Sequence, residues 1–194
     1  MNKEMLIPSL INRGWYVETG VFPDLFCSEL LNEAKDLNWQ TAKIGKGAGQ
    51  QLDQSIRNDS IHWLSSSPTS THQKFYLETM NELMLFLNRE LYLGLKEFEC
   101  HFAHYQSTGF YKKHIDQHAG TLIRAVSAIT YLNSPTEGGE LVIYKKDNPD
   151  EVEARISPKA GTFVCFLSNQ IYHEVLPTIG ERYSLTGWFR TIPS

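Results

Sequence analysis

Residues 161–190 read GTFVCFLSNQIYHEVLPTIGERYSLTGWFR, and this stretch decides the fold. It holds three short apolar runs, 161–167, 172–177 and 182–190, separated by turn-forming residues. This pattern is typical of β-strands joined by tight connections. The second run carries His173 and the third begins with Arg182, so the stretch predicts a β fold with polar side chains on some of its strands.

The same pattern extends back along the chain to residue 97. Five further candidate strands are expected at 97–106, 109–117, 124–133, 139–145 and 151–156. About eight short strands in so compact a region favour a jelly roll or a related double-layered β fold.

The chain before residue 95 has a different, helical character. Apolar residues recur at steps of three and four in the segments 24–37 and 70–91, and Asp24 is the expected N-cap of the first. The polar, glycine-containing segment 45–59 between them predicts a mobile loop. With 194 residues and no long linker, the chain is expected to form one domain.

Composition excludes several classes of protein. Hydrophobic residues make up 41% and charged residues 21%, as in ordinary globular proteins, and the net charge of −4 provides no basic footprint for nucleic acid. No window approaches the roughly 20 apolar residues of a membrane span. The three cysteines are far apart and predict neither disulfides nor a zinc site, so we expect reduced thiols and a cytoplasmic location.

A candidate metal site begins with His114-Ile115-Asp116. Residues two apart on a strand share a face, so the imidazole and the carboxylate could meet one ion, although a surface ion pair is the ordinary alternative. With His173 the set becomes two histidines and one carboxylate, the facial triad of non-haem Fe(II) enzymes. Zinc would more naturally use three ligands and one water in a tetrahedron, and magnesium and calcium prefer oxygen ligands.

Arg182 is the second candidate, because alternation places it on one face of the last strand with Thr186 and Trp188. If His173 faces inward, Arg182 is a cation inside a β fold, which is costly without a partner. A dicarboxylate could provide that partner through a two-pronged contact, and Tyr131 could add a phenol donor. The alternatives are an acidic neighbour or solvent for Arg182 and an ordinary core role for Tyr131.

These motifs carry a family resemblance. The stretch 105–188 resembles the Fe(II)- and 2-oxoglutarate-dependent oxygenases, and more closely the prolyl 4-hydroxylase group that includes the oxygen-sensing prolyl hydroxylases and their bacterial relatives. His114, Asp116, His173 and Arg182 fill the places of the family's HxD, distal histidine and basic residue. The runs YLN at 131–133, GGEL at 138–141 and IRNDSIHW at 56–63 are similar as well.

The resemblance implies a mainly β fold with flanking α-helices, built on a double-stranded β-helix (jelly roll) core with N-terminal helices packed on one sheet. Residues 1–95 would supply helical support and a substrate-covering loop, and residues 96–190 the core of a single oxygenase domain spanning residues 1–194.

The resemblance also implies roles for individual residues. His114, Asp116 and His173 would bind Fe(II) and so form the catalytic centre. Arg182 would hold the distal carboxylate of 2-oxoglutarate, assisted by Tyr131 and Thr186, and Tyr105 would line the cosubstrate pocket. Four residues would contact or cover the substrate: Arg124 and Trp188 near the cavity mouth, and Arg57 and Asp59 as anchors of the loop 45–55.

The implied activity is hydroxylation of a prolyl residue in a protein substrate, with O₂ and 2-oxoglutarate consumed, succinate and CO₂ released, and ascorbate as a supporting reductant. Elongation factor Tu is a possible partner by family analogy, while nucleic acid and membranes are not expected partners. Two alternatives stay open. One is the same chemistry on a free amino acid, a small metabolite or an asparaginyl residue, and the other is a non-catalytic β module that binds a metal or ligand.

Overall fold

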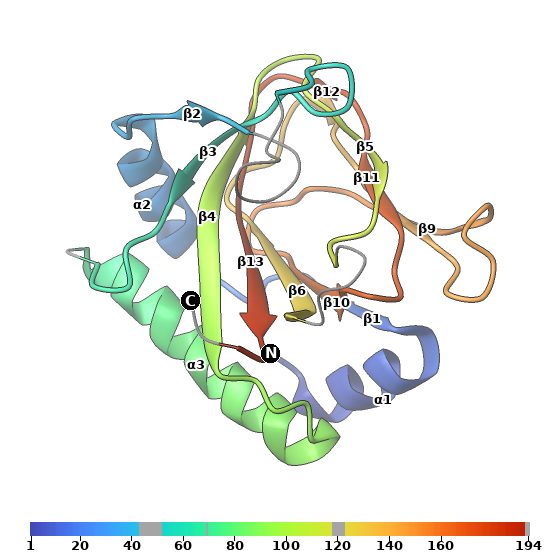
Figure 1. Ribbon diagram of the computed structural model, residues 1–194. Helices are drawn as coiled ribbons and strands as arrows, with labels where there is room; N and C mark the ends of the chain where they lie inside the picture. The colour runs from blue at the N-terminus through green and yellow to red at the C-terminus, as the bar shows by residue number, and fades with distance from the viewer. Residues whose placement is uncertain (43–51, 69, 118–122, 193–194) are drawn as a thin grey trace.

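The computed structural model describes residues 1–42, 52–68, 70–117 and 123–192. In these residues a seven-stranded and a four-stranded antiparallel sheet form the body of the molecule, and helices cover one side (Figure 1). The mainly β double-stranded β-helix fold with N-terminal helices against one sheet is therefore confirmed.

Strand order sets which residues become neighbours. The larger sheet has the order β1 (Trp15–Glu18), β10 (Phe163–Leu167), β6 (Arg124–Tyr131), β13 (Arg182–Arg190), β4 (Glu97–Tyr105), β3 (Ser60–Trp63), β2 (Gln40–Thr41). The smaller sheet has the order β5 (Tyr111–His114), β11 (His173–Val175), β8 (Leu141–Tyr144), β9 (Val152–Ile156). A two-stranded ribbon pairs β12 (Thr178–Ile179) with β7 (Glu137–Gly138).

β13 lies at the centre of the larger sheet, paired along its length with β4 and β6. Because side chains alternate along a strand, β13 sends Leu185 and Phe189 to one hydrophobic cluster and Arg182 and Thr186 to the opposite face. The first cluster packs against the helices, and a second fills the space between the two sheets.

Three helices are described: α1 (Lys3–Arg13), α2 (Asp24–Lys35) and α3 (Thr71–Leu91). α3 follows the expected apolar stripe and begins after Ser70, whose hydroxyl accepts hydrogen bonds from the backbone N–H groups of His72 and Gln73.

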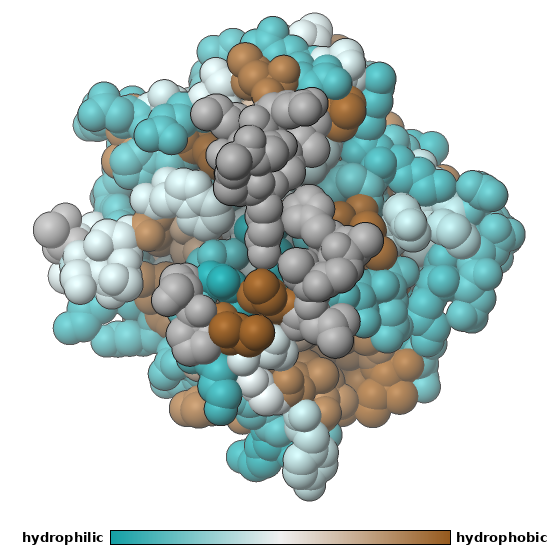
Figure 2. Space-filling view, viewed as in Figure 1, coloured by the Kyte–Doolittle hydropathy of each residue, from teal (hydrophilic) through white to brown (hydrophobic). Residues whose placement is uncertain are grey.

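The face seen in Figure 2 is largely hydrophilic, with hydrophobic residues gathered in smaller areas.

Several local expectations are corrected. Asp24 is not the N-cap of α2, because Pro23 occupies that position and Asp24 lies in the first turn, where its charge suits the helix dipole. The strand expected at 109–117 ends at His114. α1 was not predicted, since it buries only two residues, Leu6 and Leu10.

The N-terminal half contributes more than helical support. β1 extends one end of the larger sheet through β10, and β3 and β2 extend the other through β4. Residues 45–51 of the predicted loop 45–59 lie outside the described residues. No helix in the described part of the chain is long and apolar enough to cross a bilayer, and Cys27, Cys100 and Cys165 are buried free thiols.

Replacing Leu185 with alanine tests the central role of β13. Leu185 has no exposed surface, so its truncation leaves a cavity and should lower the free energy of unfolding by about 2–5 kcal/mol. The matched control is Leu85→Ala on α3, where the side chain is 60% exposed and the change should be within about 0.5 kcal/mol. Urea denaturation measures both, and equal effects would contradict this view of the core.

Candidate metal centre and adjoining cavity

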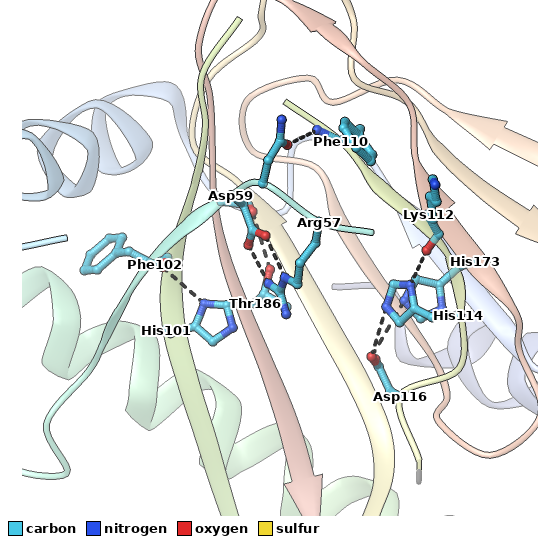
Figure 3. Close-up of polar contacts among 12 residues, drawn as sticks. Arg57, Asp59, His101, Phe102, Phe110, Lys112, His114, Asp116, His173 and Thr186 are labelled. Atoms are coloured by element: carbon cyan, nitrogen blue, oxygen red, sulfur yellow. Dashed lines mark hydrogen bonds and ion pairs between the residues drawn. The ribbon is translucent and has the colours of Figure 1, made fainter. Parts of the chain in front are cut away.

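Three potential metal ligands converge between the sheets. His114 ends β5 and His173 begins β11, and the two residues are directly paired in the smaller sheet. Asp116 reaches the same place from the bend that follows β5 (Figure 3). Its Oδ1 lies 3.5 Å from Nε2 of His114 and 3.8 Å from Nε2 of His173, and the ligand atoms of all three residues lie within 4.8 Å of one another.

Backbone carbonyls fix the orientation of both imidazoles. Nδ1 of His114 lies 2.8 Å from the Lys112 carbonyl oxygen, and Nδ1 of His173 lies 3.2 Å from that of Ile171. A carbonyl oxygen only accepts, so each Nδ1 carries the proton and donates, and each Nε2 keeps its lone pair for a metal.

Asp116 is held by a chain of buried hydroxyls. Its Oδ2 accepts a hydrogen bond of 2.5 Å from Ser127 on β6, and Ser127 lies 2.8 Å from the hydroxyl of Ser168, just after β10. One carboxylate oxygen is thereby engaged while Oδ1 faces the histidines. Burial on its own raises the pKa of the Asp116 carboxyl, but the positive charges that His173 and His114 carry when protonated, and the hydrogen bonds from His114 and Ser127, outweigh it and lower that pKa.

This donor set fits Fe(II). Two neutral imidazoles and one carboxylate are the ligands of a facial triad, which leaves coordination positions open. Burial, followed by the neighbouring charge of His114, lowers the pKa of His173 to about 4, so its imidazole is neutral at physiological pH, as a metal ligand must be.

A cavity of about 600 Å³ extends from the three ligands into the space between the sheets. Arg182 lies in its wall with 1% of its surface exposed, and its guanidinium is 4.8 Å from the ring centres of both Tyr105 and Tyr131. No acidic side chain in the described ranges forms an ion pair with Arg182, so the alternative of an acidic neighbour is not found there.

The surroundings of Arg182 are incomplete without a ligand. Its Nε and the Tyr131 hydroxyl are buried and find no hydrogen-bond partner among the described residues. Buried polar groups are normally paired, so these two atoms mark a place for an acceptor-rich guest. Gly139 allows the arginine to lie here, because a Cβ at this residue would come within 3.1 Å of the Arg182 Cδ.

Two ion pairs involve further residues of the cavity wall. Arg57 donates to both carboxylate oxygens of Asp59, over 2.7 and 2.5 Å, and its guanidinium lies 4.3 Å from the ring centre of Tyr111. Arg124 pairs with Glu99 at 3.1 Å and lies 3.5 Å from the ring centre of Trp188. All the predicted site residues except Tyr131 line this cavity, and the ring of Tyr131 lies beside Arg182.

Sequence reasoning missed several residues of the site. Ser127 and Ser168, which support Asp116, and Glu99, which pairs with Arg124, carried no motif of their own. His101 also carried no motif, and it lies in the cavity wall outside the ligand cluster. Strand alternation could have found it, because His101 and Tyr105 are four residues apart on β4 and share a face.

Comparisons with known proteins agree with this geometry. The family model of the 2OG-Fe(II) oxygenase superfamily matches residues 100–190. The chain is similar to a Pseudomonas putida prolyl-4-hydroxylase, with 34% identity and a TM-score of 0.85 over 98% of this chain and 100% of that one.

Two more distant structures share the fold. One is a prolyl hydroxylase from Trichoplax adhaerens in complex with a peptide fragment of the hypoxia inducible factor oxygen degradation domain, with 24% identity, a TM-score of 0.84 and coverage of 97% and 89% of the two chains. The other is a viral collagen prolyl hydroxylase from Paramecium Bursaria Chlorella virus-1, with 20% identity, a TM-score of 0.66 and coverage of 94% and 98%.

A His-Asp-His cluster that opens onto a cavity with a buried arginine, unpaired by any described acidic residue, together with the family match, indicates a non-haem iron oxygenase rather than a passive binding module. The similarity over the full length of the bacterial protein then narrows the assignment. The chain belongs to the 2OG-Fe(II) oxygenase superfamily, and it is a prolyl 4-hydroxylase-like dioxygenase.

Removing the Ser127 hydroxyl should weaken metal binding. Loss of a partner that orients a metal ligand typically costs about 10–100-fold in metal affinity, so Ser127→Ala should bind Fe(II) that much more weakly in an anaerobic titration. Ser127→Thr keeps a hydroxyl and should retain most of the affinity. Ser28→Ala, at an exposed serine on α2, is the control. Equal affinities for Ser127→Ala and the unmodified protein would contradict the positioning role.

Proposed function

We propose that this protein hydroxylates a prolyl residue in a protein or peptide substrate. The buried Arg182, unpaired by any described acidic residue and located in the same cavity as the His-Asp-His cluster, is the observation that carries the proposal. The similarity to a bacterial prolyl-4-hydroxylase at 34% identity supports the choice of proline.

The three clustered residues are assigned to the metal. His114, Asp116 and His173 would hold Fe(II) through two Nε2 atoms and Oδ1. Bound Fe(II) with 2-oxoglutarate supplies the chemistry in which one atom of O₂ enters a substrate C–H bond as hydroxyl and the other enters succinate, with loss of CO₂. The chain itself orients the ligands and keeps solvent away from the inner cavity.

Arg182 is assigned to the distal carboxylate of 2-oxoglutarate. A guanidinium can donate two parallel hydrogen bonds to one carboxylate, and burial between two tyrosine rings keeps competing water away. Tyr131 would add its unpartnered hydroxyl, while Tyr105 and Thr186 would line the same subsite. Ascorbate would support turnover by keeping the iron reduced.

Charge pairing in the outer cavity favours a peptidyl substrate over a free amino acid. Arg57 is neutralised by Asp59 and Arg124 by Glu99, so the described walls leave no charge unpaired besides Arg182 and the metal ligands. A free amino acid would bring an ammonium and a carboxylate into this space without partners, which is costly. A prolyl residue inside a chain brings neither charge.

The substrate contacts follow from the same walls. Arg124 and Trp188 would lie beside the target residue, and the Arg57–Asp59 pair would hold the chain that leads from the covering loop 45–55 into β3. An extended peptide suits such a site. Elongation factor Tu is the first protein partner that we would assay.

The proposal is tested by incubating the protein with Fe(II), ascorbate and 2-oxoglutarate, with and without proline-containing peptides or elongation factor Tu. We expect succinate formation that rises with substrate, and mass spectrometry should locate one added oxygen on proline. The same oxygen on asparagine, or turnover stimulated only by free amino acids, would overturn the proposal.

Arg182→Ala should raise the KM for 2-oxoglutarate by at least about 100-fold, because two charge-assisted hydrogen bonds are lost. Arg182→Lys should recover part of the loss, since lysine keeps the charge but not the two-pronged geometry. Succinate initial rates measure the effect, with Arg155→Ala at an exposed site on β9 as the control.

A stability measurement distinguishes this role from simple damage. Without cosubstrate, Arg182→Ala removes an unpaired buried charge, so its Tm should be at least as high as that of the unmodified protein. A lower Tm together with an unchanged KM would show that Arg182 serves the fold instead.

A further inference from the structure

His101 is a buried histidine that the chemistry assigned above does not use. It lies on β4 with 3% of its surface exposed, and it lines the cavity. In the larger sheet it is directly paired with Trp63 on β3 and with Thr186 on β13. His101 thus lies on the cavity-facing side of the sheet, between Trp63 and Thr186, and Thr186 belongs to the proposed cosubstrate subsite.

The protonation pattern of the His101 ring is fixed by its surroundings. Nδ1 lies 3.1 Å from the Phe102 carbonyl oxygen, so Nδ1 carries a proton and donates it (Figure 3). Burial lowers the pKa of His101 to about 4; Asp59 opposes this effect, and Arg57 and Arg124 reinforce it. The imidazole is therefore neutral, with its lone pair on Nε2.

Nε2 has no hydrogen-bond partner in the described ranges of the chain. Trp63 and Trp188 hold the ring in place, with ring centres 5.0 and 5.5 Å from that of His101. Because Nδ1 is taken by the backbone, Nε2 is the acceptor that this wall leaves for a ligand, beside Nε1 of Trp188, a buried donor that finds no partner among the described residues. Nε2 of His101 is an uncharged acceptor held rigidly between two tryptophans, so it suits a single uncharged hydrogen-bond donor.

We propose that Nε2 of His101 accepts a hydrogen bond from a backbone N–H of the peptide next to the target proline, and so helps to set substrate specificity. This inference rests on the proposed prolyl hydroxylation. Proline has no backbone N–H, so the donor must be the amide of a flanking residue. A peptide amide suits the site because it is uncharged and directional, like the acceptor that it meets.

The test uses a proline-containing peptide that the unmodified protein hydroxylates, and His101→Phe, which keeps an aromatic ring but removes the acceptor. We expect the KM for the peptide to rise roughly three- to tenfold, the loss of one neutral hydrogen bond, with the change falling on KM rather than kcat. His101→Gln offers an acceptor oxygen and should recover part of the loss. His104→Phe is the matched control, because His104 lies on the opposite face of β4 and pairs with Glu181.

A second arm changes the peptide instead of the protein. N-methylation of the amide that follows the proline should raise the KM of the unmodified protein to the level of His101→Phe, and should add little in that variant. If N-methylation of the amide before the proline has this effect instead, the hydrogen-bond donor belongs to the residue that precedes the proline. The inference is overturned if neither methylation couples to His101.

Binding without turnover provides an independent readout. With Zn(II) in place of iron and 2-oxoglutarate present, the ¹⁵N signal of His101 Nε2 should move upfield when the peptide is added, while His104 stays unchanged. If the unmodified protein hydroxylates the peptide and His101→Phe shows the same KM, only the inference about His101 is wrong. Absence of hydroxylation on every proline peptide would remove the proposed function, and this inference with it.

Discussion

A guanidinium buried between two sheets, with no described carboxylate beside it, is the constraint on which the site depends. Arg182 can be tolerated there only because the aromatic faces of Tyr105 and Tyr131 flank it and because a dianionic guest can complete its contacts. The cavity-facing side of the larger sheet therefore serves ligand binding, and the buried charge of Arg182 lowers the stability of the ligand-free protein. The opposite face of the same strand contributes Leu185 and Phe189 to the core against the helices, which offsets that cost.

The metal cluster has a comparable dependence on distant segments. His114 and His173 are brought together by pairing of β5 with β11, whereas Asp116 depends on hydroxyls from β6 and from the turn after β10. Four segments must fold before three ligand atoms face one point. The arrangement leaves little of the ligand geometry to be organised when metal binds, which favours tight and specific coordination.

Much of this was readable from the sequence because β-strands have a period of two. Alternation placed Arg182, Thr186 and Trp188 on one face of the last strand, and the described structure has that face lining the cavity. The apolar stripe of α3 was equally legible. α1 was not, because a short helix with two buried residues and an internal proline, Pro8, carries a weak periodic signal.

The remaining errors have physical causes as well. Asp116 shares the cavity with His114 although β5 ends before it, so the correct neighbourhood was predicted from an incorrect strand boundary. Partners such as Ser127 and Glu99 come from other strands, and their pairing depends on register, which a single sequence does not reveal. The roles of the outer residues remain predictions that substrate experiments must decide.

The buried cysteines have a consequence for an enzyme that handles O₂. Burial raises the pKa of the thiols of Cys27, Cys100 and Cys165, so each stays protonated and shielded from solvent. Sulfenic acid forms from the thiolate, and these buried thiols stay in the protonated form, which does not react this way. Reactive oxygen that escapes during unproductive cycles would therefore reach the exposed thioether of Met5 and half-exposed indole rings such as Trp63 before it reached a cysteine, so oxidation would appear first at methionine and tryptophan.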